Sequence, residues 1–216
     1  MNIASRLKKK SILASSSEIY GKNPTMPLTE ESDRVLGSPL VARWTYSEAK
    51  AIDEGFARTL FDKEGFKVRI VRLFNTVGPR QSPAYGMVIP RFFEAAIENS
   101  PITIHGDGTQ RRVFGHISDA IAGILALWNS DEGYGEAFNL GGFEETTIND
   151  LASRIIELTS SKSEIQYQSY QELSKEGFED IARRIPDTSK LTKLTGWKAT
   201  KNLSDILSET YRHLTA

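Results

Sequence analysis

Short apolar runs alternate along the chain with longer amphipathic segments, which is the pattern of an α/β protein with parallel strands. Runs rich in apolar and β-branched residues predict strands at 11–15, 67–73, 102–104 and 136–142, and the weaker run EIQYQ is compatible with another at 164–168. A period of 3.6 residues predicts helices over 45–63, 88–99, 118–128, 147–158, 188–195 and 202–214. We therefore expect a parallel sheet with helices on its faces.

Local signals set several element ends. Thr45 stands three residues before Glu48, the spacing of a capping box, and Gly65 is expected to end the helix that follows. Thr147 is expected to cap the fourth helix. The dipeptide Asp107-Gly108 lies between ITI and RRVFGH, and it predicts a β-hairpin that pairs these two runs.

Two stretches lack a regular pattern. Residues 20–44 form a long connection with prolines, glycines and an acidic cluster, and 177–187 is expected to be a loop. A connection as long as 20–44 inside a compact domain is usually functional or mobile.

The charge balance excludes several classes of partner. Lys and Arg number 27 and Asp and Glu 28, so a net charge of −1 offers no global field for nucleic acid or an anionic membrane. No apolar run reaches the ~20 residues that a membrane-spanning helix needs. The absence of cysteine excludes disulfides and suits a cytoplasmic location. His105, His116 and His213 lack metal-ligand spacing, so we expect surface or packing roles and no metal.

The densest group of polar residues follows the first predicted strand. Four residues stand at the carboxyl end of that strand, where parallel α/β sheets bind ligands: Ser15, Ser16, Ser17 and Glu18. Tyr46 and Lys50 lie one helical turn apart, on one face of the next helix. An ammonium near a phenol stabilises the phenolate, which makes the tyrosine a usable general base. Taken alone, this spacing is more often an exposed helix face.

The context of that spacing changes the interpretation. SSSEIYG at a strand end, RWTYSEAK on the next helix and RLFNTVGPRQ after the next strand occur in order. With YGMVIPRF, GDGTQRRVF, EAFNLGG, RRIPD and LTGW, they resemble the extended short-chain dehydrogenase/reductase family of NAD-dependent nucleotide-sugar epimerases, dehydratases and decarboxylases. The resemblance is strongest to UDP-glucuronate decarboxylases and UDP-sugar 4-epimerases. It implies the C-terminal two-thirds of an NAD(P)-binding Rossmann-type fold, a partial parallel sheet plus a small substrate-binding domain.

The family's chemistry implies roles for the matched residues. Bound NAD takes a hydride from C4 of a UDP-sugar, a 4-keto intermediate forms, and the hydride returns after epimerisation, decarboxylation or elimination. Matched by motif, Tyr46 is the general base on the C4 hydroxyl, and Lys50 activates it and binds the nicotinamide ribose. Ser16 or Ser17 is implied to bind the reacting oxygen. Glu18 matches the acidic residue of decarboxylases and some dehydratases.

The resemblance also implies contacts to the cofactor and the nucleotide. Ser15, and Arg80 in GPRQ, match cofactor-binding positions. The positions matched to the sugar nucleotide are Asn75, Val88, Arg112 and Arg184. A guanidinium such as that of Arg112 suits a diphosphate. Arg184 matches an arginine near the sugar, serving a carboxylate or a protonation step, and a structural salt bridge is the alternative.

The chain departs from the family at one point. It has no glycine-rich turn of the kind that seats a cofactor pyrophosphate on a helix N-terminus, and Gly106–Gly108 and Gly133–Gly135 are only near matches. We therefore expect residues 1–86 to be the remaining part of the dinucleotide-binding domain, with strand 136–142 returning to it. Residues 87–216 are expected to be mainly the substrate domain. The first strand is then expected to be an open sheet edge.

The sequence leaves two functions open. The first is the catalytic and substrate-binding portion of an NAD-dependent UDP-sugar decarboxylase or 4-epimerase, acting as a homodimer or with a complementing N-terminal half. The second is a non-catalytic module that binds a sugar nucleotide or a partner chain. Intact Tyr46, Lys50 and Glu18 favour the first function, whereas the missing glycine-rich turn favours the second.

Overall fold

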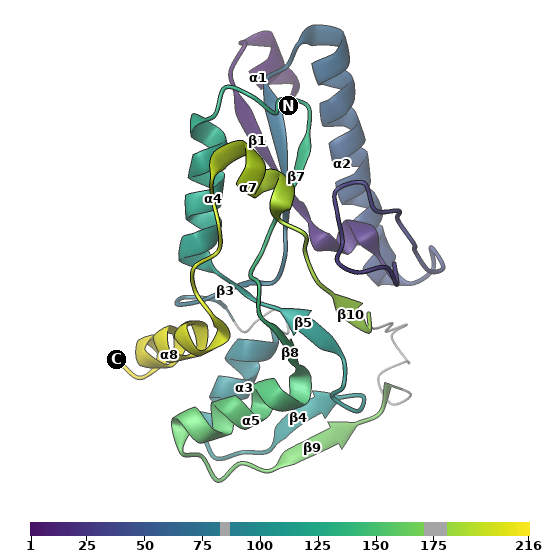
Figure 1. Ribbon diagram of the computed structural model, residues 1–216. Coiled ribbons are helices and arrows are strands. Elements are labelled where there is room, and N and C mark those ends of the chain that lie inside the picture. The colour runs from purple at the N-terminus through teal and green to yellow at the C-terminus, as the bar shows by residue number, and fades with distance from the viewer. Residues whose placement is uncertain (83–86, 171–180) are drawn as a thin grey trace.

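The computed structural model describes residues 1–82, 87–170 and 181–216. Its elements form two regions, a parallel sheet between helices and a second group of short strands and helices below it (Figure 1). The helices are α1 (Asn2–Arg6), α2 (Ala42–Glu64), α3 (Val88–Ile97), α4 (Ile117–Asn129), α5 (Ile148–Thr159), α7 (Ser189–Thr195) and α8 (Leu203–Leu214), with the 3-10 helix η1 (Ser17–Tyr20). The strands are β1 (Ser11–Ser16), β2 (Val68–Leu73), β3 (Thr76–Val77), β4 (Ile102–His105), β5 (Arg111–Val113), β6 (Gly115–His116), β7 (Ala137–Leu140), β8 (Glu145–Thr147), β9 (Ile165–Gln168) and β10 (Arg183–Arg184).

The first region is built on a parallel sheet in the order β1, β2, β7. Ser11 lies opposite Val68 and Ser16 opposite Leu73, and β7 pairs with the other side of β2. Within the described residues, β1 is therefore an edge strand. Helix α2 packs on one face of the sheet, and α4 with α7 packs on the other (Figure 1).

The central strand β2 confirms the prediction for 67–73, and both of its faces are covered. Val68 packs with the α2 cluster and Val71 with the α4 cluster, because neighbouring side chains of a strand point to opposite faces. Arg69 is also fully buried. It donates hydrogen bonds to the carbonyl oxygens of Ser130 (2.6 Å) and Glu132 (2.7 Å), which offset part of the cost of burying a guanidinium, whereas its Nη1 has no hydrogen-bond partner among the described residues.

The second region has its own core between α3, α5, α8 and the strand pair β4–β9. β4 and β9 run parallel from Ile102 opposite Ile165. β5 pairs antiparallel with β8 and parallel with β10. Phe93 of α3 stacks on Tyr211 of α8 with 5.9 Å between ring centroids, so the C-terminal helix closes this core.

The hairpin predicted around Asp107-Gly108 is wrong. The turn itself forms, since Thr109 donates from its backbone N–H (2.9 Å) and hydroxyl (2.7 Å) to one carboxylate oxygen of Asp107. The flanking strands, however, pair elsewhere, β4 with β9 and β5 with β8 and β10. Asn149 of α5 explains this, because it donates to the carbonyl oxygens of Gly108 (3.1 Å) and Asp107 (3.0 Å) and so docks the turn on α5.

The helix ends agree with the sequence signals in part. Helix α2 begins at Ala42, so the predicted N-cap at Thr45 is wrong; the residue before the helix is Val41, which makes no side-chain capping hydrogen bond. The predicted end is confirmed, with Gly65 in the left-handed region at φ 65°. Thr147 caps α5 through its hydroxyl, as predicted. None of the helices in the described ranges is long and apolar enough to cross a membrane.

Part of the segment predicted as a loop at 177–187 is a strand instead. Residues 171–180 lie outside the described residues, as do 83–86 of another predicted loop, but Arg183–Arg184 form β10 beside β5. Leu28, from the long connection, donates its N–H to the carbonyl oxygen of Ile185 at 2.8 Å. Tertiary pairing on both sides therefore makes this polar segment extended, and it fixes where its arginines lie.

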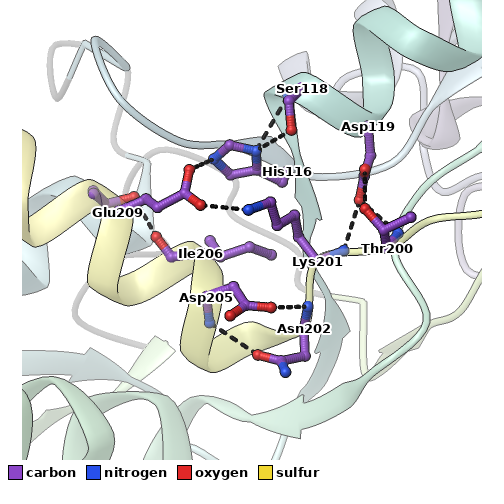
Figure 2. A network of polar contacts seen from close by, with 10 residues as sticks. His116, Ser118, Asp119, Thr200, Lys201, Asn202, Asp205, Ile206 and Glu209 are labelled. Carbon is purple, nitrogen blue, oxygen red and sulfur yellow. Dashed lines mark hydrogen bonds and ion pairs between the residues drawn. The ribbon is translucent and has the colours of Figure 1, made fainter.

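A polar network fastens the C-terminal segment to the start of α4 (Figure 2). Asp119 accepts hydrogen bonds from the N–H of Thr200 (2.9 Å), the hydroxyl of Thr200 (2.8 Å) and the N–H of Lys201 (2.9 Å). The carboxylate of Glu209 lies 2.6 Å from Nζ of Lys201 and 3.3 Å from Nε2 of buried His116. Because α4 belongs to the sheet region and α8 to the second core, this network fixes the two regions relative to each other.

Candidate active site

A cavity of about 620 Å³ opens at the carboxyl end of β1, between α2, α3 and β10. Many of the side chains predicted as functional line it: Ser16, Ser17, Glu18, Tyr46, Asn75, Val88 and Arg184. A hollow of about 250 Å³ shares several of these residues and adds Arg112. The two form one cleft that extends from the parallel sheet to the second region.

Glu18 stands at the centre of a charged cluster. It lies in η1, directly after β1, where its N–H donates to the hydroxyl of Ser16 at 3.2 Å. Its Oε1 lies 2.7 Å from Nη1 of Arg184, and both carboxylate oxygens lie 3.1 Å from Nη2 of Arg43. One carboxylate at the sheet edge is thus held between an arginine of α2 and an arginine of β10.

Burial and charge act on Glu18 in opposite directions. Burial alone would raise the pKa of its carboxyl, but the positive charges of Arg184 and Arg43 outweigh burial and hold the pKa below its usual value. Arg184 is only 5% exposed, and burial lowers the pKa of its guanidinium while Glu18 opposes that change. Arginine stays protonated in proteins. At neutral pH the cluster therefore holds two cations and one anion.

The three serines of the strand end have different environments. Ser16 uses its hydroxyl to cap η1. Ser17 is 2% exposed, and its Oγ accepts a hydrogen bond from Nη1 of Arg184 at 3.3 Å. Ser15 is buried beside the cavity, and its hydroxyl has no partner among the described residues. Ser17 is thus the serine that lies directly against the charged cluster.

Tyr46 and Lys50 lie one turn apart on α2, and only the tyrosine lines the cavity. The Tyr46 side chain is half exposed, whereas Lys50 reaches back to the sheet and donates to the carbonyl oxygen of Ala14 at 3.0 Å. Its Nζ lies 6.0 Å from the centroid of the Tyr46 ring and 3.8 Å from Asp53. The ammonium is thus anchored at the end of β1, close to the phenol.

Three further predicted residues reach the cleft from different elements. Asn75 follows β2 and donates from Nδ2 to the carbonyl oxygen of Val113 at 3.0 Å. Val88 is the first residue of α3. Arg112 lies on β5 directly opposite Arg184 of β10, so its position depends on the same strand pairing. These residues bring the second region to the cleft.

Three predicted residues, Ser15, Lys50 and Arg80, do not line the cleft, and Arg80 differs from the other two because it has no described contact with β1. It is exposed, has a left-handed backbone at φ 68°, and lines neither hollow. Its contact with a cofactor stays a prediction.

Arg43, which binds both oxygens of Glu18, was not among the residues predicted from the sequence. A signal was present, since Arg43 stands three residues before Tyr46 and so faces the same side of the helix. Phe114 and Gln81 also line the cavity without having been predicted. Phe114 is apolar and offers no chemical signal, and the position of Gln81 depends on the tertiary fold.

A further hollow of about 670 Å³ lies on the α2 side of the sheet. Its lining mixes acidic and basic side chains, among them the buried pair Glu54–Arg72, whose charged atoms lie 2.7 Å apart. Its described lining contains no predicted site residue. Nor does the described part of the chain gather three or more His, Asp or Glu side chains that could hold a metal ion.

Known enzymes resemble the chain over nearly its whole length. UDP-N-acetyl-alpha-D-glucosaminuronate decarboxylase of Bacillus cytotoxicus is 37% identical over 204 residues, which are 94% of this chain and 63% of that protein. UDP-glucuronic acid decarboxylase 1 of Danio rerio is 33% identical over 213 residues, 99% of this chain and 49% of that protein. The chain therefore spans between half and two-thirds of the length of these relatives.

Solved structures share the fold. UDP-glucuronic acid 4-epimerase of Bacillus cereus, in complex with UDP-glucuronic acid and NAD, has a TM-score of 0.87 and 26% identity, covering 99% of this chain and 64% of that one. UDP-glucose 4-epimerase of Thermotoga maritima, with UDP-glucose, has a TM-score of 0.86 and 26% identity, covering 99% and 66%. The predicted α/β Rossmann-type fold is confirmed. The family model described as GDP-mannose 4,6 dehydratase matches residues 1–210, and the chain therefore belongs to this family of extended short-chain dehydrogenases/reductases.

Proposed function

We propose that the cleft binds a UDP-sugar next to NAD and that the chain supplies the catalytic residues of a UDP-uronate decarboxylase or a UDP-sugar 4-epimerase. The observation that carries the proposal is the position of Glu18 between Arg43 and Arg184, in the cavity that Tyr46 and Ser17 also line. A phenol and an alcohol suit a sugar hydroxyl, and guanidiniums suit an anionic substituent.

The relatives support this assignment. The two curated proteins described above are decarboxylases of UDP-linked uronic acids, and the Bacillus cereus epimerase structure contains UDP-glucuronic acid and NAD. Because the chain spans less than two-thirds of these proteins, their activities are extended to it as a proposal. Between the two outcomes, the relatives above 30% identity favour decarboxylation.

The residues beside the cavity fit the nicotinamide end of NAD. Lys50 holds its ammonium at the end of β1, close to Tyr46, and the buried hydroxyl of Ser15 has no partner within the described residues. These donors suit the ribose hydroxyls and carboxamide, and Arg80 would add a more distant contact. When bound, NAD would supply the oxidation and later reduction of C4 of the sugar.

The chain's own side chains would accept the proton of the C4 hydroxyl and bind the negative charge of the sugar carboxylate. Tyr46 would accept the proton of the C4 hydroxyl. Ser17 would bind the same oxygen as a donor, because its Oγ already accepts from Arg184 and its own hydrogen is free to be donated. A ketone at C4 makes a C6 carboxylate part of a β-keto acid, which loses carbon dioxide readily. The electron pair of the broken C5–C6 bond would pass into the enolate of C4 and C5, and C5 would then take up a proton from water, which restores the ketone before C4 is reduced. Arg184, with Glu18 as its counter-ion, would hold that carboxylate.

The other end of the cleft would hold the nucleotide. Arg112 offers a guanidinium to the diphosphate, and Asn75 and Val88 line the path between it and the sugar. In this arrangement residues 1–86, with the strand inside 136–142, form the dinucleotide-binding part of the fold. Residues 87–216 mainly form the part that binds the sugar nucleotide.

Two surfaces would accept a second polypeptide. Helix α4 exposes apolar side chains about one turn apart, Ile117, Ile121, Leu125 and Trp128, and it packs next to the edge strand β1. A complementing N-terminal half would pair a strand with β1 and cover this stripe. Helix α2 exposes Ile52 and Phe56, where a homodimer would form.

Product analysis tests the proposed reaction. The chain is incubated with NAD and UDP-glucuronate, and the products are followed by NMR. Carbon dioxide with UDP-xylose identifies a decarboxylase, and UDP-galacturonate identifies a 4-epimerase. We expect Tyr46→Phe to lower turnover at least about 100-fold. Tyr167→Phe, which changes an exposed tyrosine of β9, is the matched control and should leave turnover unchanged.

The same experiment addresses the non-catalytic alternative. UDP-glucuronate binding that survives Tyr46→Phe, without conversion of substrate by any form of the chain, would refute the enzymatic proposal. Repeating the assay with a separately expressed N-terminal segment of a relative separates a chain that needs a complementing half from one that only binds.

A further inference from the structure

We infer that Arg43 determines the substrate class of this site: it fixes the carboxylate of Glu18 and supplies the positive charge that favours a sugar bearing a carboxylate over one bearing a hydroxymethyl group. The inference rests on the proposed function, because it concerns which UDP-sugar the cleft accepts. It does not require that the chain turn over substrate.

The contacts of Glu18 are divided unequally between its two arginines. Arg184 approaches Oε1 through Nη1 at 2.7 Å, whereas Nη2 of Arg43 lies 3.1 Å from both Oε1 and Oε2. Within the described part of the chain, Oε2 is therefore held by Arg43 alone. Removing Arg43 would leave the carboxylate free to rotate about a single contact, so Arg43 is a positioning residue for Glu18.

The position of Arg43 on α2 connects its contact with Glu18 to the rest of the site. It lies in the first turn of α2, on the face that also carries Tyr46 one turn later. Its guanidinium carbon lies 5.8 Å from the ring centroid of the buried Trp44. The helix that presents the phenol thus also sets the position of the carboxylate opposite it.

The charges around Glu18 show what Arg43 adds. Facing or near the carboxylate are Arg43 on α2, Arg184 on β10 and, beyond Arg184, Arg112 on β5. In the described lining of the cleft, Glu18 is the one acidic side chain. Glu18, Arg43 and Arg184 together carry one net positive charge, and Arg91 and Arg112 add to it in the lining of the cleft. Removing Arg43 lowers the positive charge next to Glu18 by one, and this is the charge that an anionic substituent can balance.

Arg184 has a donor left for such a substituent. Its Nε is buried and has no hydrogen-bond partner among the described residues, while Nη1 is used by Glu18 and Ser17. A buried guanidinium N–H without a partner costs free energy that a ligand carboxylate would recover. Arg43 thus keeps Glu18 in place while Arg184 has a donor available for the sugar.

A titration of the free chain tests the positioning step without any substrate. The carboxyl carbon of Glu18 is followed by ¹³C NMR against pH in wild type, Arg43→Gln and Arg43→Lys. We expect the pKa of Glu18 to rise in Arg43→Gln, because one of its two cations is gone, and to rise less in Arg43→Lys. Arg58→Gln, which removes the exposed Arg58–Asp62 pair near the C-terminal end of α2, is the matched control and should not change it. An unchanged Glu18 pKa in Arg43→Gln would overturn the inference.

A binding comparison tests the charge step. UDP-glucuronate and UDP-glucose are titrated calorimetrically into wild type and the same variants. We expect the ratio of their affinities to fall about tenfold or more in Arg43→Gln and to be partly restored in Arg43→Lys. Equal weakening of both ligands would show that Arg43 only supports the fold of the site. Absence of binding to either ligand in wild type would refute the proposed function and leave the NMR result to decide the positioning role.

Discussion

Replacing Glu18 by glutamine should destabilise the fold, because it leaves a buried cation without its counter-ion. Arg184 is 5% exposed and has its closest charged contact with Glu18, at 2.7 Å. Removing one member of a buried ion pair costs about 3–5 kcal/mol. Since the Glu18 side chain is 21% exposed and water moderates its interactions, we expect a loss of about 2–3 kcal/mol in the free energy of unfolding.

The pH dependence of this loss has a definite sign. The pKa of Glu18 is lowered in the folded chain, so its contribution to stability is present above the pKa of an unfolded glutamate, about 4.3, and is lost as pH falls through the folded value. The difference between wild type and Glu18→Gln should thus be complete at neutral pH and shrink on acidification below that value.

Urea unfolding followed by circular dichroism at several pH values measures the effect. Glu48→Gln, which breaks the exposed Arg34–Glu48 pair, is the control and should change stability by less than about 0.5 kcal/mol. The double variant Glu18→Gln/Arg184→Met should recover most of the loss, since it also removes the buried charge. A Glu18→Gln variant as stable as wild type, or a loss that does not depend on pH, would refute the reasoning.

Three further predictions concern contacts that position the cleft. Asp119→Ala removes three hydrogen bonds to Thr200 and Lys201 and should cost about 2–3 kcal/mol in urea unfolding, with faster amide exchange at these two residues. Gly142→Ala places a Cβ against the carbonyl oxygen of Phe114 and should lower the free energy of unfolding by about 1–3 kcal/mol. Gly55→Ala adds a Cβ in open space on α2 and should raise the free energy of unfolding by up to about 1 kcal/mol. Equal effects of the two substitutions in thermal unfolding would contradict this prediction. Tyr20→Phe removes the hydrogen bonds of the Tyr20 hydroxyl with Asn139 (2.6 Å) and Arg72 (2.9 Å), and it should lower the free energy of unfolding by about 1–2 kcal/mol. A loss below about 0.5 kcal/mol would argue against this buried network.

Patterns that depend on neighbouring residues allowed correct predictions of the fold. The apolar run 67–73 became the central strand because both faces of β2 are buried, and Gly65 ends α2 because glycine adopts a left-handed backbone without strain. The Asp107-Gly108 turn was predicted correctly as a turn and wrongly as a hairpin. A turn reverses the chain, but the partners of its flanking strands depend on contacts with Asn149 and β9 that are distant in sequence.

In the candidate site, too, the features set by neighbouring residues were predicted, and those set by distant contacts were not. The order of the motifs placed Ser17, Glu18 and Tyr46 near each other, since the strand end and the following helix meet at one sheet edge. The contact between Ser17 and Arg184 joins positions 167 residues apart, and it depends on a strand, β10, that the polar sequence did not predict. The spacing from Tyr46 placed Arg43 on the same helix face, but the contact between Arg43 and Glu18, 25 positions apart, needed the structure.

Calorimetric titration of UDP-glucuronate in the presence of NAD tests whether the cleft beside Arg184 binds a sugar nucleotide. We expect micromolar affinity, about −8 kcal/mol, that falls at least about tenfold in Arg184→Leu. Arg183→Leu is the control, because Arg183 is the neighbouring residue of β10 but pairs with Glu145 outside the cleft at 2.7 Å. Equal affinity for Arg184→Leu and Arg183→Leu, with both variants folded, would show that the sugar nucleotide does not bind in the cleft beside Arg184.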